Sequence, residues 1–309
     1  MEGVLCINYR LIGKCFNGSN LEVEVSMQIN KLSDALGAEI IDLDVREVSQ
    51  KTAEQIYEAF LEHQILVFRN QDLTPDQQIK FSEYFGEVEV HLAKDHLHPD
   101  TDKVILISNK MKNGRYVGAV SAGDYWHSDL SCQERPNLAS FLLAKELPRE
   151  GGDTGFCNQY LALDTLPPDL LKEIEGRKAV HTFNRMRNPR VRVPEMHKGD
   201  AQMRYADRAP PDAIHPIIRT HPDTGRKALY VSHRFTVGIE GMSDDESRPI
   251  LDSIFEHQLN EKFIYRHKWC LGDMIMWDNR CTTHHAYGGV PPGQIRHMHR
   301  TSLIGDIPF

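Results

Sequence analysis

The sequence of 309 residues lacks several features that would each have indicated a particular class of protein. No stretch approaches the ~18 apolar residues of a membrane-spanning helix, and no basic segment with an apolar run opens the chain, so we expect neither a membrane span nor a signal peptide. The absence of GxGxxG and GxxxxGK(S/T) motifs argues against nicotinamide and nucleotide chemistry. None of the six cysteines forms a CxxC pair, which excludes zinc-ribbon and thioredoxin-like motifs. Reduced thiols in a cytoplasmic protein are the simplest interpretation.

The chain also lacks an excess of positive charge, since its formal net charge is -8. This acidic balance argues against a nucleic-acid partner or a membrane surface, because both attract a basic face. One local stretch is nevertheless rich in arginine, with Arg185, Arg187, Arg190 and Arg192. It fits either a solvated loop or a lid that attracts an anionic substrate.

Four segments have patterns typical of helices. The first carries Ile56 and Phe60 at helical spacing, the second starts with an N-cap and a proline, and the last starts with a capping-box pattern. The first segment begins at Thr52, the second runs from Thr74 to Gly86, and the last runs from Ser243 to Asn260. The third lies within Leu161 to Gly176 and begins near Leu166 to Asp169.

Short aliphatic and aromatic runs between Pro, Gly and Asp clusters predict strands. They lie at 64–69, 103–107, 139–143, 228–231, 273–277 and 296–304. Many short strands with inserted helices indicate a mainly β fold with helical insertions, either a β-sandwich or a jelly roll. We expect a poorly patterned segment at 1–30, followed by a single domain at 31–309.

Position distinguishes a few of the 16 histidines from the rest. His127 and Asp129 form an HxD motif. If they lie on a strand, residues i and i+2 point to the same face, so an imidazole nitrogen and a carboxylate oxygen can reach one metal ion. An HxD motif also occurs by chance in many proteins, and a histidine and an aspartate on a surface strand are the alternative.

A histidine on a late strand, His284 or His285, would complete a metal site. Two histidines and one carboxylate occupy one face of an octahedral Fe(II) ion and leave three positions open for a cosubstrate and dioxygen. Catalytic zinc usually keeps one open position and fits less well. Adjacent strand residues point to opposite faces, so one of these two histidines should not be a ligand.

Arg296 and Arg300 lie an even number of positions apart, so a regular strand would direct both guanidinium groups to one face. Inside a jelly roll they would need anions, because an unpaired buried charge is costly. A guanidinium pairs well with a carboxylate. Two exposed surface arginines are the alternative.

These residues lie in blocks that resemble the taurine dioxygenase and 2,4-dichlorophenoxyacetate dioxygenase family of Fe(II)/2-oxoglutarate-dependent oxygenases. The resemblance runs from about Leu36 to the C-terminus in the family's order, and motifs this long and collinear are highly specific. The blocks are Trp126 to Asp129, Ala144 to Pro148 with Gly151 to Thr154, His215 to Pro222 with Thr224 to Lys227, Trp277 to Arg280, and Met298 to Arg300.

The resemblance implies a double-stranded β-helix, which is a form of jelly roll, and a role for each matching residue. His127, Asp129 and His284 match the iron ligands, which makes His285 the neighbour that is not a ligand. Thr154 and Arg296 match the residues that hold the far carboxylate of 2-oxoglutarate.

The resemblance also implies the reaction, in which Fe(II), 2-oxoglutarate and dioxygen hydroxylate a small substrate while 2-oxoglutarate becomes succinate and carbon dioxide. Hydroxylation next to a heteroatom would break a C–S, C–O or C–N bond. His91 and Phe235 match substrate-pocket positions, and Arg300 matches the arginine that grips the sulfonate in the taurine enzyme. We therefore expect an anionic substrate, carboxylate or sulfonate. Gly123 and Lys94 stand where the taurine enzyme has an asparagine and a tyrosine, so we do not expect taurine itself.

Two other functions are compatible with parts of this pattern. The same cofactors could support desaturation or cyclisation in secondary metabolism, whereas Asp129 argues against halogenation. A jelly roll that only binds ligands would have no reason to retain His127, Asp129, His284 and Arg296 together. Because the relatives are often dimers or tetramers, we expect a homo-oligomer.

Overall fold

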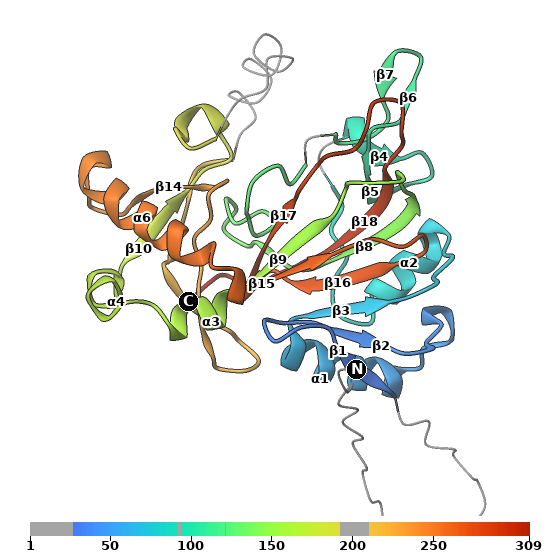
Figure 1. The fold of residues 1–309 in the computed structure, drawn as a ribbon, viewed down its shortest axis with the longest axis horizontal. Coiled ribbons are helices and arrows are strands. Elements are labelled where there is room, and N and C mark those ends of the chain that lie inside the picture. The colour runs from blue at the N-terminus through green and yellow to red at the C-terminus, as the bar shows by residue number, and fades with distance from the viewer. Residues whose placement is uncertain (1–26, 92–93, 121, 192–209) are drawn as a thin grey trace, which may run out of the picture.

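The structure is a computed structural model that describes residues 27–91, 94–120, 122–191 and 210–309 (Figure 1). Most of the N-terminal segment expected at 1–30, part of the arginine-rich stretch and the side chain of Lys94 lie outside the described residues. No helix in the described part of the chain is long and apolar enough to cross a membrane.

Two facing sheets form the central part of the molecule (Figure 1). The larger sheet has eight strands in the order β1(Ile29–Lys31), β2(Ala38–Ile40), β3(Ile65–Phe68), β16(Met274–Asp278), β8(Asn137–Glu146), β18(His297–Ile304), β5(Thr101–Ser108) and β4(Leu97–His98). The smaller sheet has the order β15(Ile264–His267), β9(Thr154–Asn158) and β17(Thr282–Ala286). This arrangement confirms the mainly β, jelly-roll fold.

The central strand β16 shows why the larger sheet is buried on both faces. Met274 and Met276 pack into the core beneath the helices, whereas Ile275 and Trp277 pack into the core between the two sheets. Alternate side chains of a strand point to opposite faces, so a strand covered on both faces carries a continuous apolar run, here Met274 to Trp277. All five residues of β16 are buried.

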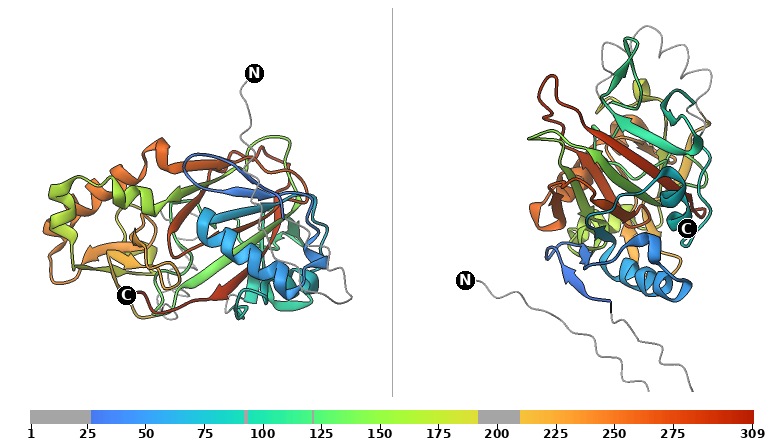
Figure 2. Two further views of the ribbon diagram at one scale, coloured as in Figure 1. Left: turned by 90° about the horizontal axis from the view of Figure 1, so that it is seen from below. Right: turned by 90° about the vertical axis from the view of Figure 1, so that its right-hand side faces the viewer.

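Helices α1(Gln50–His63) and α2(Pro75–Ser82) cover the outer face of the larger sheet (Figure 2). Ser49 caps α1, and Thr74 forms a capping box with Gln77 at the start of α2. These contacts satisfy backbone N–H groups that have no partner within the helix. They confirm both early helices, with α1 beginning two residues before the expected position.

A second layer lies between β9 and β15 in the sequence and forms the left part of the view in Figure 1. Its own apolar core is lined by residues such as Ile217, Leu251 and Phe255. Its elements are α3(Gln159–Asp164), α4(Pro168–Ile174), β10(Lys178–His181), η3(Arg185–Arg187), β11(Ala213–Pro216), β12(Ile218–Thr220), β13(Lys227–Leu229), β14(Thr236–Ile239), α6(Asp244–Gln258) and η5(Glu261–Phe263). The remaining described elements are η1(Val45–Glu47), η2(Lys94–His96), β6(Met111–Lys112) and β7(Arg115–Tyr116).

Two helix predictions need correction. The region 161–176 holds two helices: α4 begins near the expected position, but α3 precedes it as a separate helix, because Pro167 and Pro168 lack the N–H groups that a continuous helix needs. The helix expected to end at Gly86 ends at Ser82. The chain then continues through short i to i+3 turns that still bury Phe85.

Candidate metal centre

His127 and His284 are neighbours across a short antiparallel bridge. Their backbones exchange two hydrogen bonds, with N···O distances of 3.0 and 2.8 Å, and their ring centroids lie 4.0 Å apart. His284 belongs to β17, but His127 forms only this isolated bridge and Asp129 lies in the turn that follows. The expectation that His127 and Asp129 share a regular strand is therefore wrong, and the bridge and the turn bring their side chains together instead.

The three side chains converge on one point. Asp129 Oδ1 lies 3.6 Å from His127 Nε2 and 3.8 Å from His284 Nε2. One ligand atom from each residue lies within 4.8 Å of the others, and all three residues are buried. Residues from the loop before β8 and from β17 thus form a compact group of two imidazoles and one carboxylate.

Hydrogen bonds determine which nitrogen of His127 faces this point. Its Nδ1 lies 2.8 Å from the carbonyl oxygen of Tyr125 and 3.1 Å from that of His284. Carbonyl oxygens only accept, so Nδ1 carries the hydrogen and Nε2 offers a lone pair. Burial and the neighbouring His127 hold the pKa of His284 well below its usual range, so its imidazole is neutral as a metal ligand requires.

Asp129 is held in its charged form by basic neighbours. Burial raises its pKa, but the positive charge of Arg300 is the main effect that outweighs burial and holds the pKa well below the usual range. Arg300 Nη1 donates to Asp129 Oδ1 at 3.1 Å, and Ser140 Oγ donates to Oδ2 at 2.7 Å. The donor set of two imidazoles and an ionised carboxylate fits Fe(II) in the facial arrangement that leaves three positions open.

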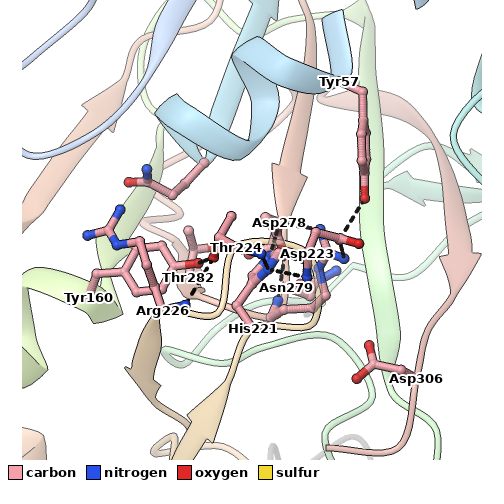
Figure 3. Close-up of polar contacts among 12 residues, drawn as sticks. Tyr57, Tyr160, His221, Asp223, Thr224, Arg226, Asp278, Asn279, Thr282 and Asp306 are labelled. Carbon is pink, nitrogen blue, oxygen red and sulfur yellow. Dashed lines mark hydrogen bonds and ion pairs between the residues drawn. The ribbon is translucent and has the colours of Figure 1, made fainter. Parts of the chain in front are cut away.

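A second cluster of possible ligands, formed by His221, Asp278 and Cys281, is better explained as a buried ion pair (Figure 3). Arg280 donates to both oxygens of Asp278, at 2.9 and 2.7 Å, and His221 Nε2 lies 3.0 Å from Oδ2. Arg280 also pairs with Asp223, which accepts a hydrogen bond from Tyr57. A guanidinium on both carboxylate oxygens leaves no place for a cation.

Thr154 and Arg296 lie side by side at the start of β9. Arg296 Nε donates to the carbonyl of Gly152 at 3.0 Å, and its Nη2 lies 3.5 Å from Thr154 Oγ1. Trp269 Nε1 donates to the same hydroxyl at 3.0 Å. Burial lowers the pKa of Arg296 to about 10, with only a partial offset from Asp153.

Among the residues that the structure describes, no carboxylate forms an ion pair with Arg296. Its Cδ also lies close to the backbone of Gly152, where an added Cβ would approach to 2.9 Å. Thr154 is two residues from Phe156, which is the cross-strand partner of His284. A half-buried guanidinium without a counterion, close to the metal ligands, is suited to hold an anion.

The residues expected in a substrate pocket occupy different sides of the site. Phe235 packs edge-on against His127, with ring centroids 6.0 Å apart. His91 is buried, and in the described part of the chain its Nε2 has no hydrogen-bond partner. Burial and the positive charge of Arg300 lower the pKa of His91 to about 4. The structure therefore places His91 within electrostatic reach of Arg300 and Asp129.

His285 points away from the metal centre. Its Nε2 lies 3.3 Å from the carbonyl oxygen of Asp124, and its ring packs against Trp126 and Tyr287 at centroid distances of 5.5 and 4.9 Å. On the same side, Gly123 has a φ of +83° and approaches His127 so closely that an added Cβ would lie 3.4 Å from Cε1.

The arginine-rich stretch is largely paired within the protein. Arg185 forms two hydrogen bonds with Asp124 at 2.9 and 2.8 Å, and Arg190 Nε lies 2.6 Å from Asp252. Arg187 pairs with Asp212. The carboxylate partners argue against an anion-attracting lid at these three residues, whereas the exposed side chain of Arg187 is compatible with a solvated loop. Arg192 lies outside the described residues.

The comparisons with known proteins agree with this geometry. Residues 28–302 match the family model described as taurine catabolism dioxygenase TauD, TfdA family. The chain belongs to this family. It is accordingly an α-ketoglutarate-dependent (2-oxoglutarate-dependent) dioxygenase, an oxidoreductase whose cofactor and cosubstrates are Fe(II), 2-oxoglutarate and dioxygen.

Members of the TauD/TfdA family with different named activities are similar to this chain. An alpha-ketoglutarate-dependent 2,4-dichlorophenoxyacetate dioxygenase of Cupriavidus pinatubonensis is 36% identical, over 84% of this chain and 92% of the relative. Pentalenolactone F synthase of Streptomyces arenae is 30% identical, over 91% and 97%. A crystal structure of AAD-2 in complex with Mn(II) and N-oxalylglycine is 29% identical with a TM-score of 0.75, covering 91% of this chain and 98% of that one.

Two residues that contact Asp129 in this TauD/TfdA protein were not predicted from the sequence. Ser140 donates to Asp129, and Asn279 accepts a hydrogen bond from the Asp129 backbone N–H at 3.1 Å. A serine in an otherwise apolar central strand was the available signal for Ser140. Asn279 stood within the Trp277 to Arg280 block, but nothing in the sequence showed what its amide contacts.

Proposed function

We propose that this protein is an Fe(II)/2-oxoglutarate-dependent dioxygenase that hydroxylates a small anionic substrate, with His127, Asp129 and His284 as the iron ligands. The observation that carries the proposal is the convergence of their three ligand atoms within 4.8 Å in a buried site. The open side of such a ligand set accommodates a chelating cosubstrate and dioxygen. Bound there, Fe(II) with 2-oxoglutarate and dioxygen supplies the oxidation that hydroxylates the substrate and yields succinate and carbon dioxide.

Thr154 and Arg296 bind the far carboxylate of 2-oxoglutarate in this proposal. The support is a guanidinium that no described carboxylate neutralises, placed beside a hydroxyl that already accepts from Trp269. Because Trp269 donates to Thr154 Oγ1, that hydroxyl is free to donate its own hydrogen to a carboxylate. A bidentate pair with Arg296 would then fix the orientation of the cosubstrate.

Arg300 binds the anionic group of the substrate, and His91 and Phe235 form the rest of the pocket. Arg300 contacts Asp129 through Nη1, and among the described residues its Nε has no hydrogen-bond partner. The unpartnered Nε2 of His91 provides a further polar contact. A carboxylate or a sulfonate fits this set, and hydroxylation next to a heteroatom would cleave a C–S, C–O or C–N bond. The named substrate of the 36% identical relative, 2,4-dichlorophenoxyacetate, is a carboxylate.

A second outcome on the same cofactors is desaturation or cyclisation in secondary metabolism, and the similarity to a relative named as a synthase, pentalenolactone F synthase, is the reason to test it. The two outcomes differ in product mass, since hydroxylation adds one oxygen whereas desaturation removes two hydrogens. Mass spectrometry of the product therefore separates them once a substrate is found.

We further propose that residues 31–309 form one dioxygenase domain, and that the protein is a cytoplasmic homo-oligomer, a dimer or a tetramer. We expect neither a nucleic-acid nor a membrane partner, and the net charge of -8 supports this. Size-exclusion chromatography with light scattering tests the oligomeric state.

Addition of Fe(II) and 2-oxoglutarate to the apoprotein without oxygen tests the proposed site. Chelation of Fe(II) by a keto acid gives a weak visible charge-transfer band, which we expect in the wild type and not in Asp129→Ala or His284→Ala. His285→Ala is the matched control, because it removes the adjacent imidazole that points away from the site, and it should keep the band. Absence of the band from wild-type protein with metal bound would refute the proposal.

A further inference from the structure

Ser140 and Asn279 form a buried clamp around Asp129. Both residues are fully buried, and they contact different parts of Asp129: Ser140 contacts the carboxylate and Asn279 contacts the backbone N–H. Ser140 is on β8 and is the cross-strand neighbour of Trp277 on β16 and of Ser302 on β18. Its side chain therefore points from the middle of the larger sheet toward the metal group.

The orientation of the Asn279 amide follows from its partners. Its Oδ1 accepts from the Asp129 backbone N–H at 3.1 Å and from Trp277 Nε1 at 3.0 Å. Both partners can only donate, so the oxygen must face them and the Nδ2 group must face the other way. There it donates to Ser140 Oγ at 3.2 Å.

The orientation of the Ser140 hydroxyl follows in turn. Its oxygen accepts from Asn279 Nδ2, and the 2.7 Å contact with Asp129 Oδ2 is made with a carboxylate that can only accept. The Ser140 hydrogen must therefore go to Asp129. Ser302 Oγ, at 3.3 Å, supplies at most a second donor to the same serine.

The turn that carries Asn279 is itself rigid. Asp278 and Arg280, its two neighbours in the sequence, form the buried ion pair described above. Figure 3 shows Asp278 close to His221 and Asp223. His221 and Asp223, both on the loop after β12, hold this pair from the other side. Because its neighbours are held in this way, Asn279 has a fixed position and can hold the groups that it contacts in place.

We infer that Ser140 and Asn279 are positioning residues that keep Asp129 a ligand through one oxygen only. This inference rests on the proposed metal site. Ser140 engages Oδ2, while Oδ1 is the oxygen that lies 3.6 and 3.8 Å from the two histidine Nε2 atoms. A carboxylate that turned both oxygens toward the metal would occupy one of the three positions needed by 2-oxoglutarate and dioxygen. The clamp therefore keeps the metal positions for 2-oxoglutarate and dioxygen open, and it also increases the metal affinity.

Titration of the apoprotein with Mn(II), followed by 2-oxoglutarate, tests the clamp without turnover. We expect Ser140→Ala to weaken Mn(II) binding by about 10-fold or more, as the loss of a hydrogen bond to a metal ligand typically does, and to weaken 2-oxoglutarate binding to the Mn(II) form as well. Ser140→Thr keeps the hydroxyl and should restore both affinities. Ser302→Ala is the matched control, an equally buried hydroxyl on the neighbouring strand that does not touch Asp129, and it should bind Mn(II) like the wild type.

Asn279→Asp provides a nearly isosteric second variant. Its second carboxylate oxygen cannot donate to Ser140 and would accept the serine hydrogen instead, so we expect weaker 2-oxoglutarate binding here too. A purely structural role would lower the melting temperature of the apoproteins without changing affinities measured far below it. If Ser140→Ala binds Mn(II) and 2-oxoglutarate as Ser302→Ala does, the clamp is refuted and the proposed function stands. If the wild type binds no Mn(II), the proposed function itself fails.

Discussion

His127 and His284 are separated by 157 residues in the sequence, yet each donates its backbone N–H to the carbonyl of the other. The backbone therefore fixes the spacing of the two imidazoles independently of any metal ion. Site geometry that exists before the metal binds reduces the conformational cost of binding. A larger side chain at a small residue packed against this bridge should therefore displace the imidazoles and weaken metal binding.

Gly123 is one such residue, and Gly123→Ala should weaken metal binding. The substitution places a methyl group 3.4 Å from His127 Cε1 and also strains a backbone with a φ of +83°. Gly241→Ala is the matched control, because that glycine has a φ of +78° with open space around it. Both variants should lose about 1 kcal/mol of stability from the backbone, but only Gly123→Ala should change the Mn(II) dissociation constant. Equal dissociation constants in the two variants would show that the contact with His127 has no effect.

Arg296→Lys should raise the KM for 2-oxoglutarate by about 10- to 100-fold, because a charged hydrogen-bonded pair contributes about 1.5–3 kcal/mol and lysine lacks the bidentate geometry. The control is Arg266→Lys, which changes an exposed arginine on β15 that pairs with Asp153. Succinate formation measured against 2-oxoglutarate concentration gives the KM for 2-oxoglutarate of both variants. An unchanged KM in Arg296→Lys would remove Arg296 from the cosubstrate site.

Arg300→Ala should weaken binding of the anionic substrate much more than binding of 2-oxoglutarate. Its Nη1 contacts Asp129 Oδ1, so a small effect on metal affinity is also expected. The shift of the anaerobic charge-transfer band can be used to screen carboxylates and sulfonates with the wild type and to compare dissociation constants with the variant. A compound that binds both proteins equally well would contradict the assignment of Arg300 to the substrate anion.

Asp278 should contribute to stability in a pH-dependent way. Burial raises its pKa, but Arg280 and His221 outweigh burial and hold the pKa well below the ordinary value of 3.8. A carboxylate whose pKa is lowered in the folded state stabilises the protein fully at pH values above its pKa in the unfolded state. This contribution is lost as the pH falls through its pKa in the folded state.

Urea unfolding between pH 3 and 7 checks this contribution. At pH 7, Asp278→Asn should lower the free energy of unfolding by about 3–5 kcal/mol, since it breaks a buried ion pair. The difference from the wild type should shrink below about pH 4, where Asp278 begins to be protonated in the unfolded wild type but stays ionised in the folded protein. The control is Asp72→Asn, which changes an exposed partner of Lys145 and should leave the free energy of unfolding unchanged. A constant difference at every pH would show that the charge of Asp278 is not the cause.

Local patterns predicted most of the secondary structure because their causes are local. The capping box at Ser243 and the N-cap at Thr74 determine where α6 and α2 begin, and the apolar run of β16 determines that it is covered on both faces. The two prolines indicated the start of α4, but the short helix α3 before them was not predicted as a separate element.

The sequence alone determined the mainly β fold with inserted helices, the family, and the residue types of the metal group. Only the tertiary structure decided how these residues meet. The HxD motif is not part of a regular strand, and its convergence depends on a backbone bridge between His127 and His284. Likewise, the orientations of Asn279 and Ser140 depend on donors and acceptors from separate strands and turns. Hydrogen-bond geometry between distant segments is set by packing, and no local pattern along the chain encodes it.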